Sequence, residues 1–420
     1  MTSTPTSPRT GAEAERRVRP TPLADRALAP DLARGMMLLL IALAHAPWFL
    51  YLTDVGASPM HPADGTWPDR LAQALTIVVV DGRTHTMFGL LFAYGIGQMA
   101  ARQTARGIPA DQIRGTLRRR HLWMLVFGLV HAALLWQGDI LGTYGLIGLL
   151  MMPLFFRRSD RTLGVWISVL LVLGAAGMLL SMLSTLLVPG TDAAAAAAAS
   201  QRVSLAEPSA LLASLIRLPQ WLFGLVSGVA TLALPTVFLI GLLAARHRVL
   251  EEPQQHRRLL TWVAGVGIGI GWSVGLAQAL VHLGFLELSN PSLLGPATFY
   301  SGIFAGAGYA ALFGLIADRI RTRAARESLP VRALSALGRR SLSGYLAQSA
   351  VYAPLLTAWG LGLGAHLSSW SAMLLAVAVW LATLMGALAL ERAGRRGPAE
   401  VLLRRLSYGS DTQSFQAIHR

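Results

Sequence analysis

The stretch that most constrains the fold runs from Arg118 to Leu150, where two long apolar runs are separated by a short polar connection. The connection, Gln137–Asp139, has the length of the links that join neighbouring antiparallel helices in bundles. Basic residues precede the first run, and polar and aromatic residues surround the turn: Arg118, Arg119 and Arg120, then Trp136, Asp139 and Tyr144. The pattern predicts a helical hairpin with membrane spans near residues 119–136 and 140–156.

The composition extends this interpretation to the whole chain. Of 420 residues, 54% are hydrophobic and only 14% are charged, whereas soluble domains carry about 25% charged residues. We therefore expect an all-α, polytopic transmembrane bundle of about ten helices at residues 30–392. A disordered tail at 1–29, without the apolar core of a signal peptide, precedes the bundle, and a tail at 393–420 with a short amphipathic helix follows it.

The distribution of charge predicts the orientation of the chain. The net charge is +15, and all 36 basic residues are arginines. In the predicted topology only Arg70, Arg83, Arg202 and Arg217 lie on the side opposite to the termini. The positive-inside rule then places both termini on the cytoplasmic side of the membrane. The basic loops favour contact with membrane lipids, and no motif supports binding to nucleic acid.

Two regions leave alternatives open. Residues 70–101 are interrupted at Asp81, and we expect a surface-lying segment before a span that starts near Thr84, rather than one long protruding helix. A sixth span is expected to end near Ala245. The run Ala193–Ala199 predicts a helical or irregular excursion on the outer side.

The first span suggests a functional pair. Asp31 and Arg34 share one helix face at the inner end, and His45 follows about 16 Å further along the axis. His131 lies about 15 Å beyond His121 on its own helix. Because a charge at a helix centre costs about 2.5–3.5 kcal/mol, such side chains normally face the bundle interior. The structural alternative is that Arg34 anchors the helix at the lipid surface and His45 bonds a neighbouring helix.

Further candidates lie near the predicted outer side. His85 stands at the entrance of a span, and Asp139 would either orient a histidine or cap the following helix. Trp136 and Tyr144 fit substrate contacts or interfacial aromatics equally well. A polar stripe on a later span would line a pocket or join helices: Ser341, Tyr345 and Gln348. No metal site is predicted, since close ligand spacings are lacking, and neither a Walker A sequence nor a GxSxG elbow occurs.

Several stretches resemble the YeiB-like family of bacterial membrane proteins, a domain of unknown function. They are the Asp31-x-x-Arg34-Gly35 opening, GLLFAYGIG, the hairpin GLVHAALLWQGDILGTYGLIGLL, GRRSLSGYLAQS and the closing GPAEVLLRRLSYG. The family is distantly similar to transmembrane acyltransferases, both the OafA-like O-acetyltransferases and the heparan N-acetyltransferase. In the OafA-like group an arginine and a histidine with ten residues between them on the first helix are linked to activity, and Arg34 and His45 have this spacing.

The same resemblance implies a donor. Basic residues at the start of the third helix are linked to coenzyme A in the OafA-like group, and Arg118, Arg119 and Arg120 occupy that place without reproducing the spacing. The heparan enzyme's catalytic histidine follows its first helix, so His61 and His85 are candidates for that role. The resemblance therefore implies acyl-CoA as a co-substrate, with no bound cofactor.

Three functions remain open from the sequence. The first is acyl transfer from cytoplasmic acyl-CoA to an envelope glycan, lipid or small molecule, with His45 or His131 as general base. Arg34 would then pair with donor phosphate, and Tyr345 or Gln348 would line the pocket. The second is proton-coupled transport through buried histidines. The third is a non-catalytic protein that binds lipid or a partner; the sequence does not fix the oligomeric state.

Overall fold

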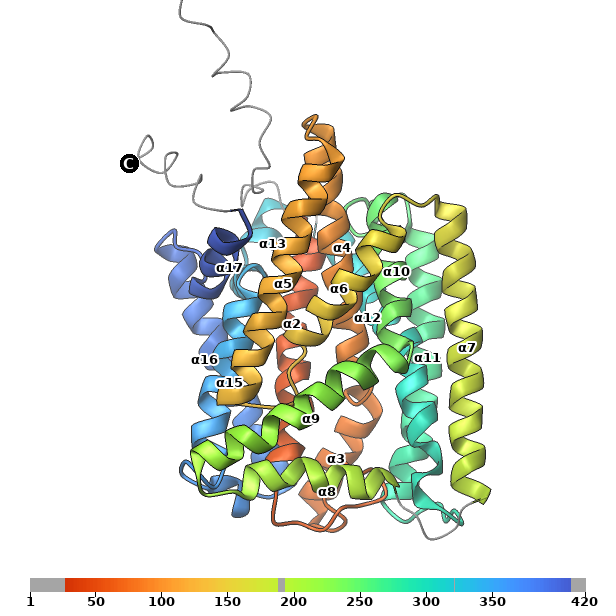
Figure 1. Cartoon of the computed structure of the whole chain (residues 1–420), viewed down its shortest axis with the longest axis vertical. Coiled ribbons are helices and arrows are strands. Elements are labelled where there is room, and N and C mark those ends of the chain that lie inside the picture. The colour runs from red at the N-terminus through yellow and green to blue at the C-terminus, as the bar shows by residue number, and fades with distance from the viewer. Residues whose placement is uncertain (1–26, 188–192, 321, 409–420) are drawn as a thin grey trace, which may run out of the picture.

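The computed structural model describes residues 27–187, 193–320 and 322–408, and within these ranges it is a bundle of long helices (Figure 1). The described residues form no β-strand beyond a single bridge between Val55 and Pro62. The predicted all-α class is therefore confirmed.

The helices follow one another with short connections. In chain order they are α2 (Leu28–His45), η2 (Ala46–Phe49), α3 (Trp67–Val79), α4 (Thr84–Ala105), α5 (Ala110–Leu134), α6 (Leu141–Phe155), α7 (Asp160–Leu187), α8 (Ala193–Ala206), α9 (Ala210–Ala230), α10 (Ala233–Arg246), α11 (Arg257–His282), η3 (Pro291–Leu294), α12 (Gly295–Arg319), α13 (Arg323–Glu327), α14 (Leu329–Arg339), α15 (Ser341–Leu356), η4 (Leu363–Ala365), α16 (Ser369–Arg392) and α17 (Pro398–Tyr408).

Seven helical segments of the described chain are long and apolar enough to cross a membrane, and α6 and α10 are apolar but shorter. The helix α7 gives the clearest indication of contact with lipid, because most of its side chains are exposed and apolar. Soluble proteins rarely expose so large an apolar surface to water. The chain is thus a helical membrane protein. Ten spans and cytoplasmic termini stay predictions.

Two local expectations differ from the structure. The expected sixth span is two helices: α9 slants across α5 and α6, while α10 packs against α4 inside the bundle (Figure 1). The segment before Thr84 is also not surface-lying, because α3 packs against α11 and α16. The alanine-rich run forms the start of α8, which lies across one end of the bundle (Figure 1).

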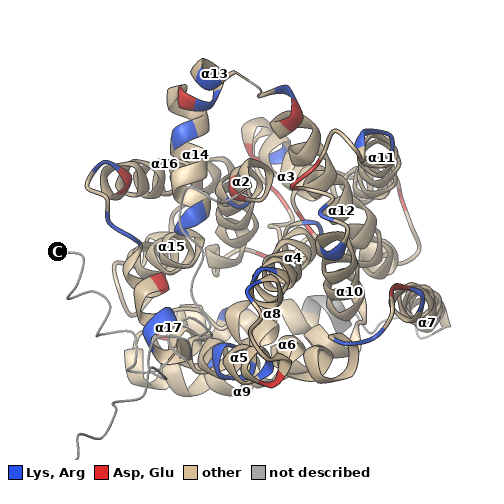
Figure 2. Ribbon diagram, turned by 90° about the horizontal axis from the view of Figure 1, so that it is seen from above, with Lys and Arg blue, Asp and Glu red and all other residues tan. Residues whose placement is uncertain are grey.

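The two ends of the bundle differ in charge. One end carries α13, α14, α17 and the connections between α4 and α5 and between α10 and α11, and we call it the arginine-rich face; basic residues on α13, α14 and α17 stand out in Figure 2. The described chain begins and ends there. The other end, with α3's start and α8, is called the opposite face. The positive-inside rule makes the arginine-rich face the expected cytoplasmic one.

Candidate functional site

The centre of the candidate site is a buried pair of His131 and Asp139. His131 Nδ1 lies 3.0 Å from Asp139 Oδ1, and both side chains are about fully buried, with 1% and 0% of their surface exposed. The α5–α6 hairpin creates the pair, because the turn folds the residue that precedes α6 back beside the last turn of α5. Neither imidazole nitrogen of His131 has a hydrogen bond of regular geometry among the described residues, so the contact with Asp139 is a close ion-pair distance. The arrangement places a carboxylate beside one imidazole nitrogen and leaves the other nitrogen available.

Asp139 performs both of the roles that the sequence left open. Its Oδ2 atom accepts a hydrogen bond from the Gly142 backbone at 2.6 Å, within the first turn of α6, and another from Trp221 Nε1 at 3.3 Å. Because the first-turn N–H groups of a helix lack internal partners, the carboxylate caps α6 while its other oxygen holds the histidine.

The close approach of α5 and α6 depends on Gly128. A Cβ atom at this position would overlap Asp139 Oδ2 and the backbone of Gly142. We therefore expect Gly128→Ala to push the carboxylate away from His131 and to destabilise the fold by about 1–3 kcal/mol, the usual cost of overpacking. Thermal unfolding in detergent measures the effect. Gly115→Ala in the same helix is the control, since nothing lies near its Cβ; equal melting temperatures of the two variants would contradict the assignment.

A chain of ring contacts connects His131 with Tyr345, His45 and Trp136. The Tyr345 ring centroid lies 5.1 Å from that of His131 and 6.3 Å from that of His45. His45 in turn lies 5.9 Å from the Trp136 ring. Tyr345 is fully buried, and its hydroxyl accepts a hydrogen bond from the Ile140 backbone at 3.4 Å. The structure thus brings together residues from α2, the α5–α6 turn and α15, which the sequence had predicted separately.

A cavity of about 280 Å³ leads from the arginine-rich face to this cluster. Tyr345 and Leu141 lie at its inner end, where Tyr345 is shared with the histidine cluster. Its basic lining residues come from five separate segments: Arg34, Arg102, Arg120, Arg339, Arg340, Arg396 and Arg404. Only two carboxylates, Asp31 and Glu400, line the same cavity. The cavity is suited to an anionic ligand whose other end reaches the histidines.

The wall of this cavity explains why two of the sequence stretches occur together. Glu400 of α17 accepts hydrogen bonds from the backbones of Leu342 and Ser343, at 2.8 and 3.1 Å, and so caps α15 from another helix. Arg340, just before α15, pairs with Glu391 of α16 at 2.8 Å. The closing segment GPAEVLLRRLSYG therefore positions the start of the GRRSLSGYLAQS helix.

The remaining predicted residues divide between this site and other places. Arg34 pairs with Asp31 at 3.6 Å and donates to the Leu91 carbonyl at 2.7 Å. Arg118 and Arg119 are exposed and do not line the cavity, whereas Arg120 does. Consecutive helical residues point in different directions, so only one of the three arginines can face the interior.

Other candidates lie outside the histidine cluster. His85 packs beside Phe299, with 6.0 Å between ring centroids. The Tyr144 hydroxyl donates to the His85 carbonyl at 2.6 Å. Gln348 donates to the Leu38 carbonyl at 3.2 Å and so joins α15 to α2, which is the structural role considered for it. Tyr408 lines the cavity from α17; burial raises the pKa of its hydroxyl, and the nearby Arg120 and Arg106 oppose the shift.

Sequence reasoning missed most of the cavity's arginines. The positive-inside rule accounts for every arginine on the predicted cytoplasmic side, so it does not single out those that line the cavity. The arginines missed in this way are Arg102, Arg339, Arg340, Arg396 and Arg404. Only the folding of α4, α14 and α17 around one opening distinguishes them from the exposed arginines. Helical phase within α17 separates Arg404, which lines the cavity, from the exposed Arg405.

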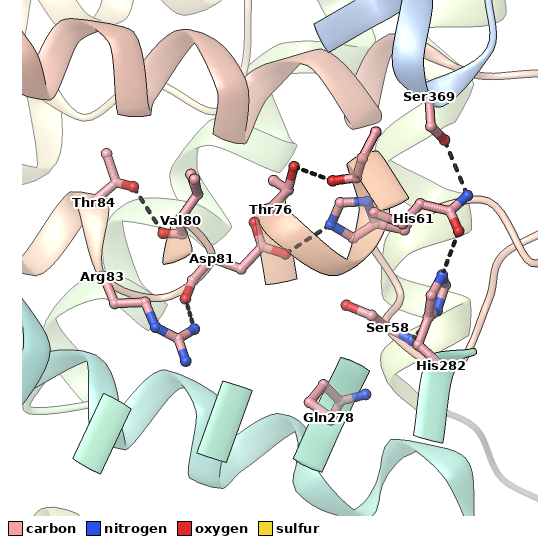
Figure 3. Close-up of polar contacts among 12 residues, drawn as sticks. Ser58, His61, Thr76, Val80, Asp81, Arg83, Thr84, Gln278, His282 and Ser369 are labelled. Carbon is pink, nitrogen blue, oxygen red and sulfur yellow. Dashed lines mark hydrogen bonds and ion pairs between the residues drawn. The ribbon is translucent and has the colours of Figure 1, made fainter. Parts of the chain in front are cut away.

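Figure 3 shows a second buried histidine–carboxylate pair, formed by His61 and Asp81. His61 Nε2 lies 2.7 Å from Asp81 Oδ2, and each side chain is 1% exposed. His282 packs beside His61 at 5.8 Å between ring centroids and accepts from the Ser58 backbone at 3.1 Å. Arg83 donates to the carbonyls of Asp81 and Gly271. The cluster joins the loop after η2 to the break between α3 and α4 and to α11.

No group of three or more metal-ligating side chains occurs in the described ranges. The two histidine–carboxylate pairs therefore each offer a proton-transfer or structural contact, and the described geometry gives no reason to assign a metal to either.

Comparison with known proteins gives relatives over nearly the full length. A family model described as a protein of unknown function (DUF418) matches residues 244–410. The uncharacterized protein YxaH of Bacillus subtilis (strain 168) is 26% identical over 409 residues, covering 93% of this chain and 96% of the relative. The uncharacterized protein YeiB of Escherichia coli (strain K12) is 27% identical over 396 residues, covering 89% and 92%. No solved structure matches. The YeiB-like resemblance is confirmed; the similarity to acyltransferases stays a prediction.

Proposed function

We propose that this relative of the YeiB and YxaH proteins is an inner-membrane acyltransferase, which moves an acyl group from cytoplasmic acyl-CoA to an envelope glycan, lipid or small molecule. One observation carries the proposal. The arginine-lined cavity ends at Tyr345, whose ring packs against His131 of the His131–Asp139 pair. A phosphate-binding entrance and an oriented base are thereby connected inside the membrane domain.

The entrance fits the polyphosphate part of acyl-CoA. Guanidinium groups form strong, charge-assisted hydrogen bonds to phosphate. Seven arginines line the entrance, and the two lining carboxylates together with Glu251 and Glu391, which pair with Arg102, Arg339 and Arg340, leave it with a net positive charge. The apolar inner half, with Phe88, Phe92 and Met124 among its lining residues, suits the acyl chain and the thioester end. The donor would enter from the arginine-rich face with its thioester directed toward Tyr345.

The chemistry follows from the orientation of His131. With Nδ1 held by Asp139, Nε2 takes the proton of the acceptor's hydroxyl or amine as its oxygen or nitrogen attacks the thioester carbonyl. The new acyl bond forms, the C–S bond breaks, and the protonated imidazole returns its proton to the departing thiolate. Asp139 stabilises the imidazolium in between, as carboxylates do beside catalytic histidines. His45, without a carboxylate contact among the described residues, would position the acceptor.

Proton-coupled transport is the second candidate, because a further buried pair, His61 and Asp81, lies in the same domain. A relay between the pairs would require a connecting path. The cavity instead opens to the arginine-rich face and includes Tyr345, whose ring packs against His131, which favours acyl transfer.

The direct test uses protein purified in detergent, acetyl-CoA labelled in the acetyl group, and an extract of bacterial envelope. We expect label to appear in an extract component with the wild-type protein and not with His131→Ala. The mass of the labelled component would identify the acceptor. Absence of transfer, together with absence of CoA binding, would overturn the proposal.

The donor entrance has its own prediction. Arg120→Gln combined with Arg404→Gln removes two charges from the cavity lining and is expected to raise the Kd for CoA at least tenfold, since each lost charge-assisted bond is worth about 1.5–3 kcal/mol before screening. Microscale thermophoresis with CoA measures it.

A matched control is built into the same helices. Arg119→Gln combined with Arg405→Gln makes the same change of charge at the adjacent, exposed positions. An equal loss of CoA affinity in both double variants would show that net charge, and not the cavity, governs binding.

A further inference from the structure

The loop of residues 53–66 joins η2 to the start of α3 and is bonded to the end of α11. The side chain of Gln278 donates to the Ala57 carbonyl at 3.1 Å. One turn later in α11, His282 Nδ1 accepts a hydrogen bond from the backbone N–H of Ser58 at 3.1 Å (Figure 3). Two successive loop residues are thereby held by one helix end.

The Ser58 donor fixes the protonation state of His282. A backbone N–H can only donate, so the Nδ1 atom that accepts from it carries no proton. The other ring nitrogen, Nε2, lies 3.2 Å from Gln73 Oε1 and therefore carries the single proton of the ring. The amide of Gln73 is oriented by its own Nε2 atom, which donates to the Asp64 carbonyl at 3.1 Å and to Ser369 Oγ at 3.0 Å. His282 is thus neutral while the loop is bonded to it.

A second proton on His282 would break this contact. An imidazolium has two N–H donors and no acceptor, so its Nδ1–H group would face the N–H group of Ser58. Both partners are buried, with 4% of Ser58 and 7% of His282 exposed, and a buried donor without an acceptor is costly. The contact is also tight, because a Cβ atom at Gly56 would overlap the His282 ring. The loop must therefore move when the ring takes up a proton.

The charged groups around His282 favour the same outcome. From α3, Arg70 donates to the carbonyl of the residue after His282 and repels a positive charge on the ring. From the loop, His61 lies 5.8 Å away between ring centroids and repels it as well when protonated. Asp81 is paired with His61 at 2.7 Å and faces that ring. The Pro62 carbonyl alone among these groups attracts a proton to His282.

The carboxylates of the loop and of the first turn of α3 do not compensate for this repulsion. Asp54 and Asp64 are exposed. Asp69 accepts hydrogen bonds from the backbones of Thr66 and Trp370, at 3.0 Å each. The contact from α16, Ser369, carries no charge.

We propose that His282 is a pH-sensitive latch, which holds the loop of residues 53–66 closed while its ring is neutral and releases the loop as the ring takes up a proton. Since the loop leads into the start of α3 on the opposite face, the latch responds to the compartment away from the arginine-rich face. The proposal does not rest on acyl transfer, because the latch residues are distinct from those of the donor cavity and of the His131–Asp139 pair.

The direction of the pH dependence follows from proton linkage. An imidazole released into water titrates near pH 6.5, whereas the closed loop requires the neutral ring. Opening is therefore coupled to proton uptake and becomes more favourable below about pH 6.5, by up to about tenfold for each pH unit. Between pH 7.5 and pH 5.0 the equilibrium constant for opening rises by at most about thirtyfold.

Hydrogen exchange of the full-length protein in detergent tests the latch. Exchange at residues 53–66 is measured at pH 7.5 and pH 5.0, and each rate is divided by the intrinsic rate of the same peptide at that pH. We expect the opening of the wild-type loop to increase at least tenfold at pH 5.0. In His282→Asn an amide oxygen replaces Nδ1 as the acceptor for Ser58 and does not titrate, so we expect a change of less than threefold. His282→Gln is the second variant without a titrating group, for use if the asparagine variant does not fold.

The matched control makes the same substitution at another histidine. His366→Asn lies at an exposed position after η4 and is expected to keep the full response of the wild type. A wild-type loop whose corrected exchange is the same at both pH values would overturn the proposal. An equal increase in the wild type and in the His282 variants would also overturn it, because the pH dependence would then belong to another group, such as His61.

Discussion

Replacing His131 with alanine is expected to slow acyl transfer by about 10²–10⁴-fold, the usual contribution of a general base, while the affinity for CoA stays unchanged. The reason is geometric: His131 packs against Tyr345, which lines the cavity whose arginines would hold the donor. Single-turnover transfer of labelled acetyl groups measures the rate, and CoA titration measures the affinity.

Two contributions of Asp139 can be tested separately: its negative charge beside His131 and its hydrogen bond that caps α6. In Asp139→Asn the amide oxygen can still accept from the Gly142 backbone and cap α6, but the negative charge beside His131 is lost. We expect a rate loss close to that of His131→Ala with little change in melting temperature, whereas Asp139→Ala should lose both. His85→Gln, at a histidine outside the cluster, is the control. Full activity of Asp139→Asn would remove the carboxylate from the mechanism.

The sequence predicted the hairpin, and it offered Asp139 as a residue that orients a histidine or caps the next helix, because both features are local. The two residues are separated by one short turn, so helix geometry alone brings them together. The arginine cavity is different, since α2, α4, α5, α14 and α17 each contribute residues that are distant in sequence. The rotation of α5 about its axis determines which of Arg118, Arg119 and Arg120 faces the interior. Three identical residues in a row do not reveal that rotation from the sequence.

The second histidine pair was missed for another reason. His61 lies in an irregular loop and Asp81 at a break between two helices, so no periodic pattern relates them. From the sequence, the interruption at Asp81 was interpreted as the boundary between a surface-lying segment and a span. In the structure it is a break between α3 and α4, with Gly82 at a φ of +74°. Packing of α3 against α11 and α16 pulled that segment into the bundle, which depends on contacts that one sequence does not display.

Removing Asp81 is expected to have the largest effect on stability. Asp81→Ala leaves His61 buried without its carboxylate, beside His282. Removing one partner of a buried hydrogen-bonded pair leaves the other desolvated and unsatisfied, which costs about 1–3 kcal/mol, and more where the remaining group is charged. Unfolding in mixed detergent and dodecyl sulfate micelles, followed by circular dichroism, measures the loss.

Two comparisons show whether the pair or the loop is responsible. Asp64→Ala removes an exposed carboxylate of the same loop and is expected to change stability by less than about 0.5 kcal/mol, as for ordinary surface substitutions. His61→Leu combined with Asp81→Leu removes both polar groups and is expected to recover part of the loss, since apolar replacements of a whole buried pair are often tolerated. A double variant as unstable as Asp81→Ala would mean that the hydrogen bond itself, and not the unpaired histidine, sets the stability of this part of the bundle.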